Sequence, residues 1–281
     1  MSNMYPDSPL GKVSSYIDTY TPSLLYPIAR DEGRELIGVQ GELPFKGYDV
    51  WNAYELSWLN SKGKPINACG EFILSCETPK IVESKSLKLY LNSFNMSRFD
   101  SIEQARQTMI KDLSEVIENE MIVNLFPVEQ IERKPSIYNT LFAPNAESIC
   151  LDNLDVSCEH FKPTPNLLQC ETTVQKQVFY SHSMRSKCLV TAQPDWASVF
   201  IEYHGPKLVP ESLLRYIVSY RDHEEFHEQC AERMFMDITR LANPSELSVF
   251  IRYTRRGGID INPFRTNKDV KEYKNLRTVR Q

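Results

Sequence analysis

One short stretch of the chain combines a nucleophile, two cations and an acid. Cys188 follows Arg185 and Lys187, and Asp195 comes seven positions later, directly before Trp196. A cysteine attacks as its thiolate, and nearby cationic side chains lower the pKa of the thiol. A carboxylic acid enclosed by an aromatic ring can keep its proton near neutral pH and donate it. The stretch therefore predicts covalent catalysis by Cys188, although a free cysteine is also a common small apolar core residue.

Two basic segments are candidates for binding an anion. Lys85 and Lys88 lie in a segment with helical periodicity, and Arg255 and Arg256 precede Gly257-Gly258. The lysines equally suit a solvated helix face, and Gly-Gly suits the tip of a hairpin. Both interpretations stay open at the level of the sequence.

Length and composition indicate two ordinary domains. The chain has 281 residues, of which 41% are hydrophobic and 25% charged, as is typical of a soluble globular protein. A net charge of −5 gives no general attraction to nucleic acid or to an anionic membrane. The start of the chain is polar without a following apolar segment, and no run reaches the length of a membrane span.

The cysteines and glycines exclude several kinds of site. Seven cysteines without a CxxC pair argue against a disulfide framework and against structural zinc. We therefore expect a reducing, cytoplasmic setting and no metal. The ten glycines form neither a GxGxxG turn nor a P-loop, so a nucleotide would be held by other means.

Hydrophobic periodicity predicts the same order of elements in each half of the chain. In the first half we expect strands over 48–59 and 66–77, helices over 82–94 and 101–120, and strands over 121–126 and 128–131. In the second half we expect strands over 174–180 and 189–203, helices over 210–221 and 226–241, and strands over 247–254 and 259–261. Ser84 or Ser86 is the expected helix cap, His204-Gly205-Pro206 an expected turn, and Asn262-Pro263 an expected break.

The two halves also align in sequence. Residues 102–113 match residues 227–238 without a gap, with Glu, Gln, Met and Asp in register. Upstream, Glu83-Ser84 aligns on Glu211-Ser212, and residues 90–94 resemble residues 216–220, with two residues fewer between the two matches in the second half. The shared element order favours a duplication. The first copy then carries the lysines and the second carries Cys188 and Asp195, so that a composite site would use both.

Four motifs together resemble one enzyme family. These are Glu83-Ser84-Lys85-Ser86-Leu87-Lys88, the stretch from Cys188 to Trp196, Phe226-His227-Glu228, and residues 253–263. They resemble the NADPH-dependent 7-cyano-7-deazaguanine reductases, the nitrile reductases of queuosine biosynthesis, in their long form with two tandem tunnelling-fold (T-fold) domains. The resemblance implies an α+β fold in which each domain is an antiparallel sheet with two helices in ββααββ order. We expect an irregular N-terminal arm at 1–45, T-fold domains at 46–134 and 174–281, and a connector at 135–173.

The resemblance also implies the reaction and the residues that carry it. The nitrile of 7-cyano-7-deazaguanine would be reduced by four electrons to the amine of 7-aminomethyl-7-deazaguanine, with two NADPH per turnover. Cys188 would form a thioimide with the nitrile, Asp195 would donate a proton, and His227 would position the substrate and assist proton transfer. The implied substrate-binding residues are Val82, Glu83, Ser84, Phe226, His227 and Glu228.

Charge and hydrogen bonding explain two of these implied roles. A carboxylate such as Glu228 can accept both N–H groups on one edge of the deazaguanine ring, and Glu83 would contribute from the other half. The helix that opens at Ser84 would offer free backbone N–H groups to the cofactor phosphates. The implied cofactor-binding residues are Ser84, Lys85, Lys88, Arg255, Arg256 and Gly257.

Two other classes of function remain as alternatives. A T-fold hydrolase of a pterin or purine, similar to a cyclohydrolase, would need a metal or an activated water, and the sequence has no cluster of zinc ligands. A non-catalytic purine-binding or tRNA-associated module is disfavoured by the net charge of −5 and the lack of a basic stripe. Because a lone T-fold sheet leaves open edges, we expect at least a homodimer, with no direct partner among nucleic acids or membranes.

Overall fold

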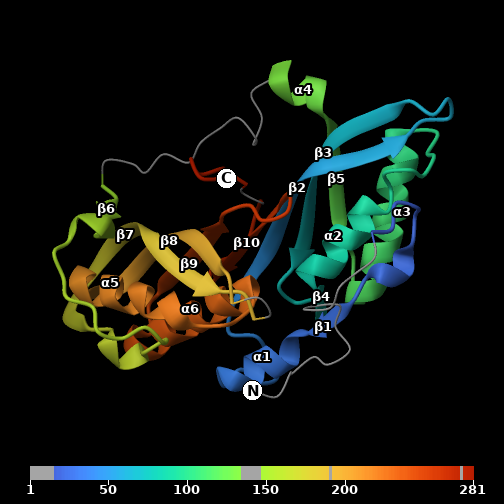
Figure 1. The fold of residues 1–281 in the computed structure, drawn as a ribbon. Helices are drawn as coiled ribbons and strands as arrows, with labels where there is room; N and C mark the ends of the chain where they lie inside the picture. Colours follow the sequence, from blue (N-terminus) through green and yellow to red (C-terminus); the bar gives the residue numbers. More distant parts are fainter. Residues whose placement is uncertain (1–15, 134–146, 190–191, 273–274) are drawn as a thin grey trace. The chain divides into compact units, whose positions relative to one another are not determined.

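The computed structural model describes residues 16–133, 147–189, 192–272 and 275–281 and has a mixed α+β architecture (Figure 1). By its contacts the chain divides into two compact units. Of the described residues, unit 1 contains 16–32, 50–133 and 256–259, and unit 2 contains 33–49, 147–189, 192–255, 260–272 and 275–281. Within these ranges no helix is long and apolar enough to cross a membrane.

Unit 1 is built on three neighbouring strands in the order β5-β3-β2. A turn at residues 60–64 joins β2 to β3, and the Asn60 side chain accepts hydrogen bonds from the Lys62 and Lys64 backbone at 2.9 and 3.0 Å. Helix α3 packs on β4 and β5, and β1 and β4 form a separate antiparallel pair. The elements are β1 (Pro27–Ala29), β2 (Lys46–Leu59), β3 (Pro65–Ser75), β4 (Lys80–Val82), α2 (Ser84–Asn92), α3 (Ile102–Ile117), β5 (Ile122–Pro127) and α4 (Val128–Arg133).

Unit 2 is a sheet in the order β10-β9-β8-β7-β6, antiparallel except for the short pair β6 and β7. Helices α5 and α6 cover one face of it, with α5 against β7 and α6 against β9 (Figure 1). Alternation along the strands turns Val199, Ile201, Val249 and Ile251 toward these helices, where all are buried. The elements are α1 (Arg30–Leu36), β6 (Ile149–Cys150), β7 (Cys170–Lys187), β8 (Pro194–Leu208), α5 (Pro210–Val218), α6 (His227–Ala242), β9 (Glu246–Tyr253) and β10 (Ile259–Thr266). Strand β2, helix α1 and strand β10 are each divided between the two units.

The sequence located most elements correctly. The hairpin of β2 and β3, helix α3 with its Ser101 cap, both helices of unit 2 and strand β9 lie where periodicity predicts them. The predicted strand from Leu189 is observed from Pro194 onward, and residues 190 and 191 lie outside the described ranges. In the second half the observed order is β7-β8-α5-α6-β9-β10.

Three predictions about strands and turns were wrong. The strand predicted at 128–131 is helix α4, in which good helix formers follow Pro127. The turn predicted at His204-Gly205-Pro206 lies inside β8, where Pro206 pairs with Val174 beside a register shift that tolerates proline. The break predicted at Asn262-Pro263 lies inside β10, which continues to the fully buried Arg265.

The arm and the cap of α2 also differ from expectation. The described part of residues 1–45 was expected to be irregular, but it contains β1 and α1. Helix α2 is capped by Glu83 and not by Ser84 or Ser86. Serine is much more common than glutamate at a helix N-cap, so residue preferences at this position favoured the neighbouring serines.

Several hydrogen bonds recur at matching positions in both halves. Tyr90 donates to Asp112 at 2.7 Å, and Tyr216 donates to Asp237 at 2.6 Å. Ser86 donates to the carbonyl of the cap residue Glu83, and Ser212 donates to the carbonyl of the cap residue Val209, both at 2.7 Å. Ser86 is therefore the counterpart of Ser212, and the alignment of Glu83-Ser84 on Glu211-Ser212 was wrong by two positions.

The corrected register extends the repeat beyond what sequence comparison indicated. Ser93 accepts from the backbone of Thr21 at 3.2 Å, and Ser219 accepts from the backbone of Thr164 at 3.3 Å. Each threonine opens a similar stretch, Thr21-Pro22-Ser23-Leu24-Leu25 and Thr164-Pro165-Asn166-Leu167-Leu168. Segments far apart in the chain thus occupy equivalent places in the two halves.

We predict that Tyr90→Phe and Tyr216→Phe each lower the free energy of unfolding by about 1.5–3 kcal/mol, because a buried carboxylate loses a donor. Chemical denaturation followed by circular dichroism measures the change. Tyr16→Phe is the control, since the Tyr16 hydroxyl lies on an exposed surface beside Asn95. Equal stability of all three variants and the parent chain would contradict the prediction.

Candidate active site

Cys188 and Asp195 lie at the same end of the hairpin formed by β7 and β8. Ser186 pairs with Asp195 in the ladder, and the Cys188 backbone N–H donates to the Gln193 carbonyl at 3.0 Å. Cys188 is partly exposed, whereas Asp195 is 4% exposed. Cys188 directly follows β7, and this backbone bond places it opposite Gln193, two residues before Asp195. The predicted nucleophile and acid therefore share one edge of unit 2.

His227 completes this group from the first turn of α6. Its Nε2 lies 3.4 Å from Oδ2 of Asp195. The imidazole ring is stacked on the ring of Tyr253, with the centroids 3.8 Å apart. Tyr253, at the end of β9, opens one of the family motifs but was given no role from the sequence, because only the tertiary structure brings it under the histidine. The arrangement fixes the plane of the imidazole and directs one nitrogen at the carboxylate.

The floor of this group excludes water. Tyr253 is 1% exposed and Cys230, on the next turn of α6, is fully buried. Burial raises the pKa of both groups well above their ordinary values, and the charge of Asp195 adds to each shift. Tyr253 and Cys230 are therefore uncharged over the physiological range and form a neutral wall around Asp195 and His227.

Phe226 and Glu228 lie at the start of α6 with His227. Glu228 is 3% exposed, which is unusual for a carboxylate at the beginning of a helix. Phe226 occupies the cap position, where its ring offers no acceptor to the first N–H groups of the helix. Gln229 accepts from the Phe226 backbone at 3.3 Å and completes the turn. Of the three consecutive residues Phe226, His227 and Glu228, the structure brings His227 into contact with Asp195.

Glu225 supports this helix start and was not found from the sequence. It accepts hydrogen bonds from Arg233 at 2.6 and 3.0 Å and lies 2.8 Å from Nε2 of His223. Burial alone would raise the pKa of Glu225, but the contacts with His223 and Arg233 outweigh burial and leave the pKa below its ordinary value of 4.5. An ionised Glu225 therefore braces the segment directly before Phe226.

The side chains around Cys188 and Asp195 make contacts that the sequence did not predict. Lys187 is paired with Asp222, and the guanidinium of Arg185 lies 5.6 Å from the centroid of the Trp196 ring. Both cations are thus engaged by other groups. Trp196 is 37% exposed and points to the face opposite Asp195, because adjacent strand residues alternate. Tyr253 and Cys230, and not Trp196, enclose the acid.

The second predicted set lies in unit 1 around the start of α2. Val82 is buried in β4, and Glu83 follows it as the cap of α2. The Glu83 carboxylate accepts from the Lys85 and Ser86 backbone N–H groups, both at 2.7 Å. The expectation of free N–H groups at this helix start was therefore wrong. Burial raises the pKa of Glu83 above 4.5, although these hydrogen bonds and the charge of Lys88 lower it.

Lys88 and the loop from Arg256 to Ile259 form a hollow on unit 1. Glu55, Lys88 and Gly257 line it. A Cβ atom on Gly257 would lie 3.3 Å from Cδ of Lys88, and the φ of Gly257 is +58°. The loop is a hairpin tip, as the Gly-Gly pair suggested, with Arg256 donating to the Ile259 carbonyl at 2.9 Å. The neighbouring Arg255 belongs to unit 2 and is exposed.

A larger cavity lies away from the predicted residues. It has a volume of about 360 Å³ and is lined by Phe200, Phe250 and Phe264 of unit 2. Alternation places these rings on the face of the sheet opposite the helices, and none of the predicted site residues lines the cavity. Among the described residues, no group of three or more His, Cys, Asp or Glu side chains is placed to hold a metal ion.

Two family models match the sequence. The model described as "Nitrile reductase, 7-cyano-7-deazaguanine-reductase N-term" matches residues 16–125, and the model described as "QueF-like protein" matches residues 194–272. The first match contains the start of α2, and the second contains Asp195, His227 and Glu228.

Curated relatives match almost the full length of the chain. A protein of Azoarcus sp. (strain BH72) is 52% identical over 92% of this chain and 90% of its own length. Proteins of Paraburkholderia phymatum and Albidiferax ferrireducens are 48% and 47% identical, over 98% and 99% of this chain and 98% and 100% of their own lengths. All three are named NADPH-dependent 7-cyano-7-deazaguanine reductase. Among solved structures, the archaeosine synthase QueF-Like in the apo form covers 34% of this chain and 95% of its own, at 21% identity and a TM-score of 0.30, which is too low to carry an argument about the fold.

We predict that Glu225→Gln lowers the free energy of unfolding by about 1–3 kcal/mol near neutral pH, because Arg233 loses a buried charged partner. The pKa of Glu225 is lowered by folding, so its contribution is complete above about pH 5 and is lost as the pH falls through the folded-state pKa. Denaturation of both proteins from about pH 5.5 to pH 3 should show the difference shrinking. Glu115→Gln, on an exposed face of α3, is the control, and a difference that does not change with pH would contradict the assignment.

Proposed function

The chain belongs to the NADPH-dependent 7-cyano-7-deazaguanine reductase family, and from this premise we propose that it reduces its nitrile through a covalent adduct on Cys188. The chain is an NADPH-dependent nitrile oxidoreductase that converts 7-cyano-7-deazaguanine to 7-aminomethyl-7-deazaguanine in queuosine biosynthesis. The observation that carries the mechanism is the contact between Asp195 and His227 at the hairpin end that bears Cys188.

The first step forms the carbon–sulfur bond. The Cys188 thiolate adds to the nitrile carbon, one π bond of the nitrile breaks, and its electron pair moves to nitrogen. Asp195 donates a proton to that nitrogen, which leaves a thioimide on the enzyme. The buried position of Asp195 supports this role, because a carboxyl group shielded from water favours its neutral form.

The following steps reduce the thioimide to the amine. NADPH, when bound, supplies the hydride that the substrate carbon accepts, and a second NADPH supplies the next. After the first hydride the substrate nitrogen takes a second proton, which His227 and Asp195 can deliver. The carbon–sulfur bond then breaks, Cys188 leaves as thiolate, and the resulting iminium accepts the second hydride. Two hydrides and two protons account for the amine.

Substrate binding is assigned to the starts of the two helices. The buried carboxylate of Glu228 is suited to accept the two N–H groups of the deazaguanine edge in a bidentate contact. Phe226 precedes it and offers an apolar ring, and His227 orients the nitrile end. Val82, Glu83 and Ser84 complete the proposed set. Glu83 already caps α2, but a carboxylate has about four acceptor positions and retains capacity for a ligand.

Among the predicted cofactor residues, Lys88 and Gly257 lie close together and suit a phosphate-bearing ligand. Lys88 lies against the glycine tip at Gly257, where a side chain would crowd the lysine. Lys85 lies in the first turn of α2, and Arg255 and Arg256 flank the same tip in sequence. These cations, with Ser84, are the proposed phosphate ligands. We assign the phosphates to these side chains because the N–H groups at the start of α2 already donate to Glu83.

We further propose that each half is a T-fold domain, with boundaries at 46–134 and 174–281, an arm at 1–45 and a connector at 135–173. The recurring hydrogen bonds of the two halves support a duplicated domain. All seven cysteines are free thiols, which supports a reducing, cytoplasmic site of action. The family assignment favours neither a cyclohydrolase-like reaction nor a purely binding role.

We predict that incubation with the nitrile in the absence of NADPH adds the mass of one substrate molecule to each chain. The adduct should be absent in Cys188→Ala, and NADPH oxidation should fall by at least about 10³-fold in that variant because the uncatalysed nitrile is a poor hydride acceptor. Intact-mass spectrometry and absorbance measure the two effects. Cys170→Ala, far along β7, is the control. Turnover by Cys188→Ala at the parental rate would refute the covalent mechanism.

We also predict a homodimer or a larger homo-oligomer. In unit 1, β5 ends the strand order and presents an open edge among the described residues, and open edges are usually covered by association. Light scattering coupled to size exclusion measures the mass in solution. A species with the mass of a single chain across the working concentration range would contradict the prediction.

A further inference from the structure

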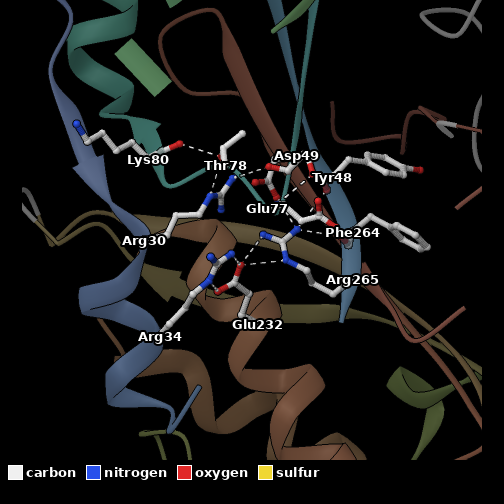
Figure 2. Close-up of polar contacts among 11 residues, drawn as sticks. Arg30, Arg34, Tyr48, Asp49, Glu77, Thr78, Lys80, Glu232, Phe264 and Arg265 are labelled. Carbon is white, nitrogen blue, oxygen red and sulfur yellow. Dashed lines mark hydrogen bonds and ion pairs between the residues drawn. The ribbon is translucent and has the colours of Figure 1, made fainter. Parts of the chain in front are cut away.

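A buried carboxylate on α6 is held by two arginines. Glu232 is 2% exposed, and Arg34 donates to both of its oxygens, through Nε at 3.0 Å and Nη2 at 2.9 Å. Arg265 donates to Oε1 from Nε at 3.1 Å and from Nη2 at 2.9 Å. Figure 2 shows the carboxylate of Glu232 between the two guanidinium groups. The carboxylate therefore receives four charge-assisted hydrogen bonds away from water.

The second arginine is itself fixed. Arg265 is fully buried in β10, and its Nη1 donates to Oδ1 of Asp49 at 2.7 Å and to the Tyr48 carbonyl at 3.2 Å. Glu232 is thus anchored on one side to the sheet. On the other side Arg34 comes from α1, in the part of the arm that belongs to unit 2.

Helix α1 touches α6 at a second point. A Cβ atom on Gly33 would lie 1.9 Å from Nε2 of Gln229, so only glycine allows this approach. Gln229 is the residue whose side chain closes the first turn of α6. The α1 segment therefore contacts α6 both at its first turn and one turn later, at Glu232.

The position of Glu232 links this contact to the proposed site. Glu228 and Glu232 are four residues apart on α6, hence on the same side of the helix and about 5–6 Å apart between Cβ atoms. Glu228 is 3% exposed and His227 is 3.4 Å from Asp195, so neither tolerates a rotation of the helix. A shift at Glu232 would be transmitted directly to both.

The first copy of the repeat provides an internal comparison. Glu103 and Gln107 occupy the positions of Glu228 and Glu232 on α3. There Glu103 is exposed and pairs with Arg106, on its own helix, at 2.7 Å, and Gln107 donates to Glu103. The buried carboxylate with two arginines from other elements therefore exists in the copy that carries His227 and Glu228, and the other copy has a solvated helix face in its place.

We propose that Arg34 is a positioning residue of the reductase: through Glu232 it sets the axial position of α6 and with it the placement of Glu228 and His227. This inference rests on the proposed function, in which these two residues bind and orient the nitrile. It gives α1, in the N-terminal arm, a direct part in substrate affinity. Loss of Arg34 also leaves part of the buried negative charge of Glu232 uncompensated, one turn from Glu228. This charge disfavours the ionised form of Glu228, which the N–H groups of the substrate require.

The test compares Arg34→Met and Arg34→Lys with the parent enzyme. We expect Arg34→Met to raise KM for the nitrile by about 10–100-fold with a smaller change in kcat, as for loss of hydrogen bonds to a charged group. Arg34→Lys keeps the charge but not the bidentate contact and should give an intermediate KM. Arg106→Met, which removes the exposed pair of the first copy, should leave KM within about twofold of the parent, as is usual for a surface pair.

The affinity for noncovalently bound nitrile separates an effect on substrate placement from a loss of stability. The Kd of the nitrile is measured by calorimetry in the Cys188→Ala background, with and without Arg34→Met, at a temperature where both are folded by circular dichroism. If Arg34→Met does not fold, Arg34→Lys carries the test. A KM and Kd within twofold of the parent in the folded Arg34 variants, with only thermal stability reduced, would overturn the inference. An inactive parent enzyme would instead overturn the proposed function.

Discussion

The first turns of α6 are held by ion pairs that centre on two buried carboxylates, Glu225 and Glu232. Glu232 is held between Arg34 and Arg265, and Glu225 is held by Arg233 and His223 directly before the helix. Removing one partner from such a pair leaves an uncompensated buried charge, which costs more than the intact pair contributes. These contacts therefore permit little variation in where the helix begins. His227 and Glu228, which lie in the first turn of this helix, are placed by these contacts.

The site combines this rigid frame with a dry interior. Asp195 faces His227, whose ring rests on Tyr253, and Cys230 lies buried on the next turn of the helix. Burial raises the pKa of the tyrosine and of the thiol well above their ordinary values, so both groups stay neutral beside the acid and the imidazole. Proton transfer between a few defined groups is more effective in such surroundings than in water, because the dipoles are already oriented.

The two halves share a set of structural contacts and differ at other positions. Both copies keep the buried tyrosine that donates to an aspartate, Tyr90 to Asp112 and Tyr216 to Asp237, and the serine that fixes the helix entry. They differ at the cap of the first helix, which is Glu83 in one copy and Val209 in the other. The conserved contacts stabilise each half, whereas the residues that differ are those assigned to ligands.

Local sequence was sufficient for what depends on local physics. Periodicity located the β2–β3 hairpin and helices α3, α5 and α6. The motifs identified the family, and Cys188, Asp195 and His227 stay predictions drawn from them. Chain breaks were less predictable, because Pro206 and Pro263 are accommodated by strand pairing that no short window contains. The tertiary structure alone decided that Trp196 turns away from Asp195 and that Tyr253 lies beneath His227. It also decided that Glu83 caps its own helix and that Arg34 reaches Glu232 across 198 residues. Each of these depends on side chains from separate elements meeting in a water-free interior, which spacing along the chain does not encode.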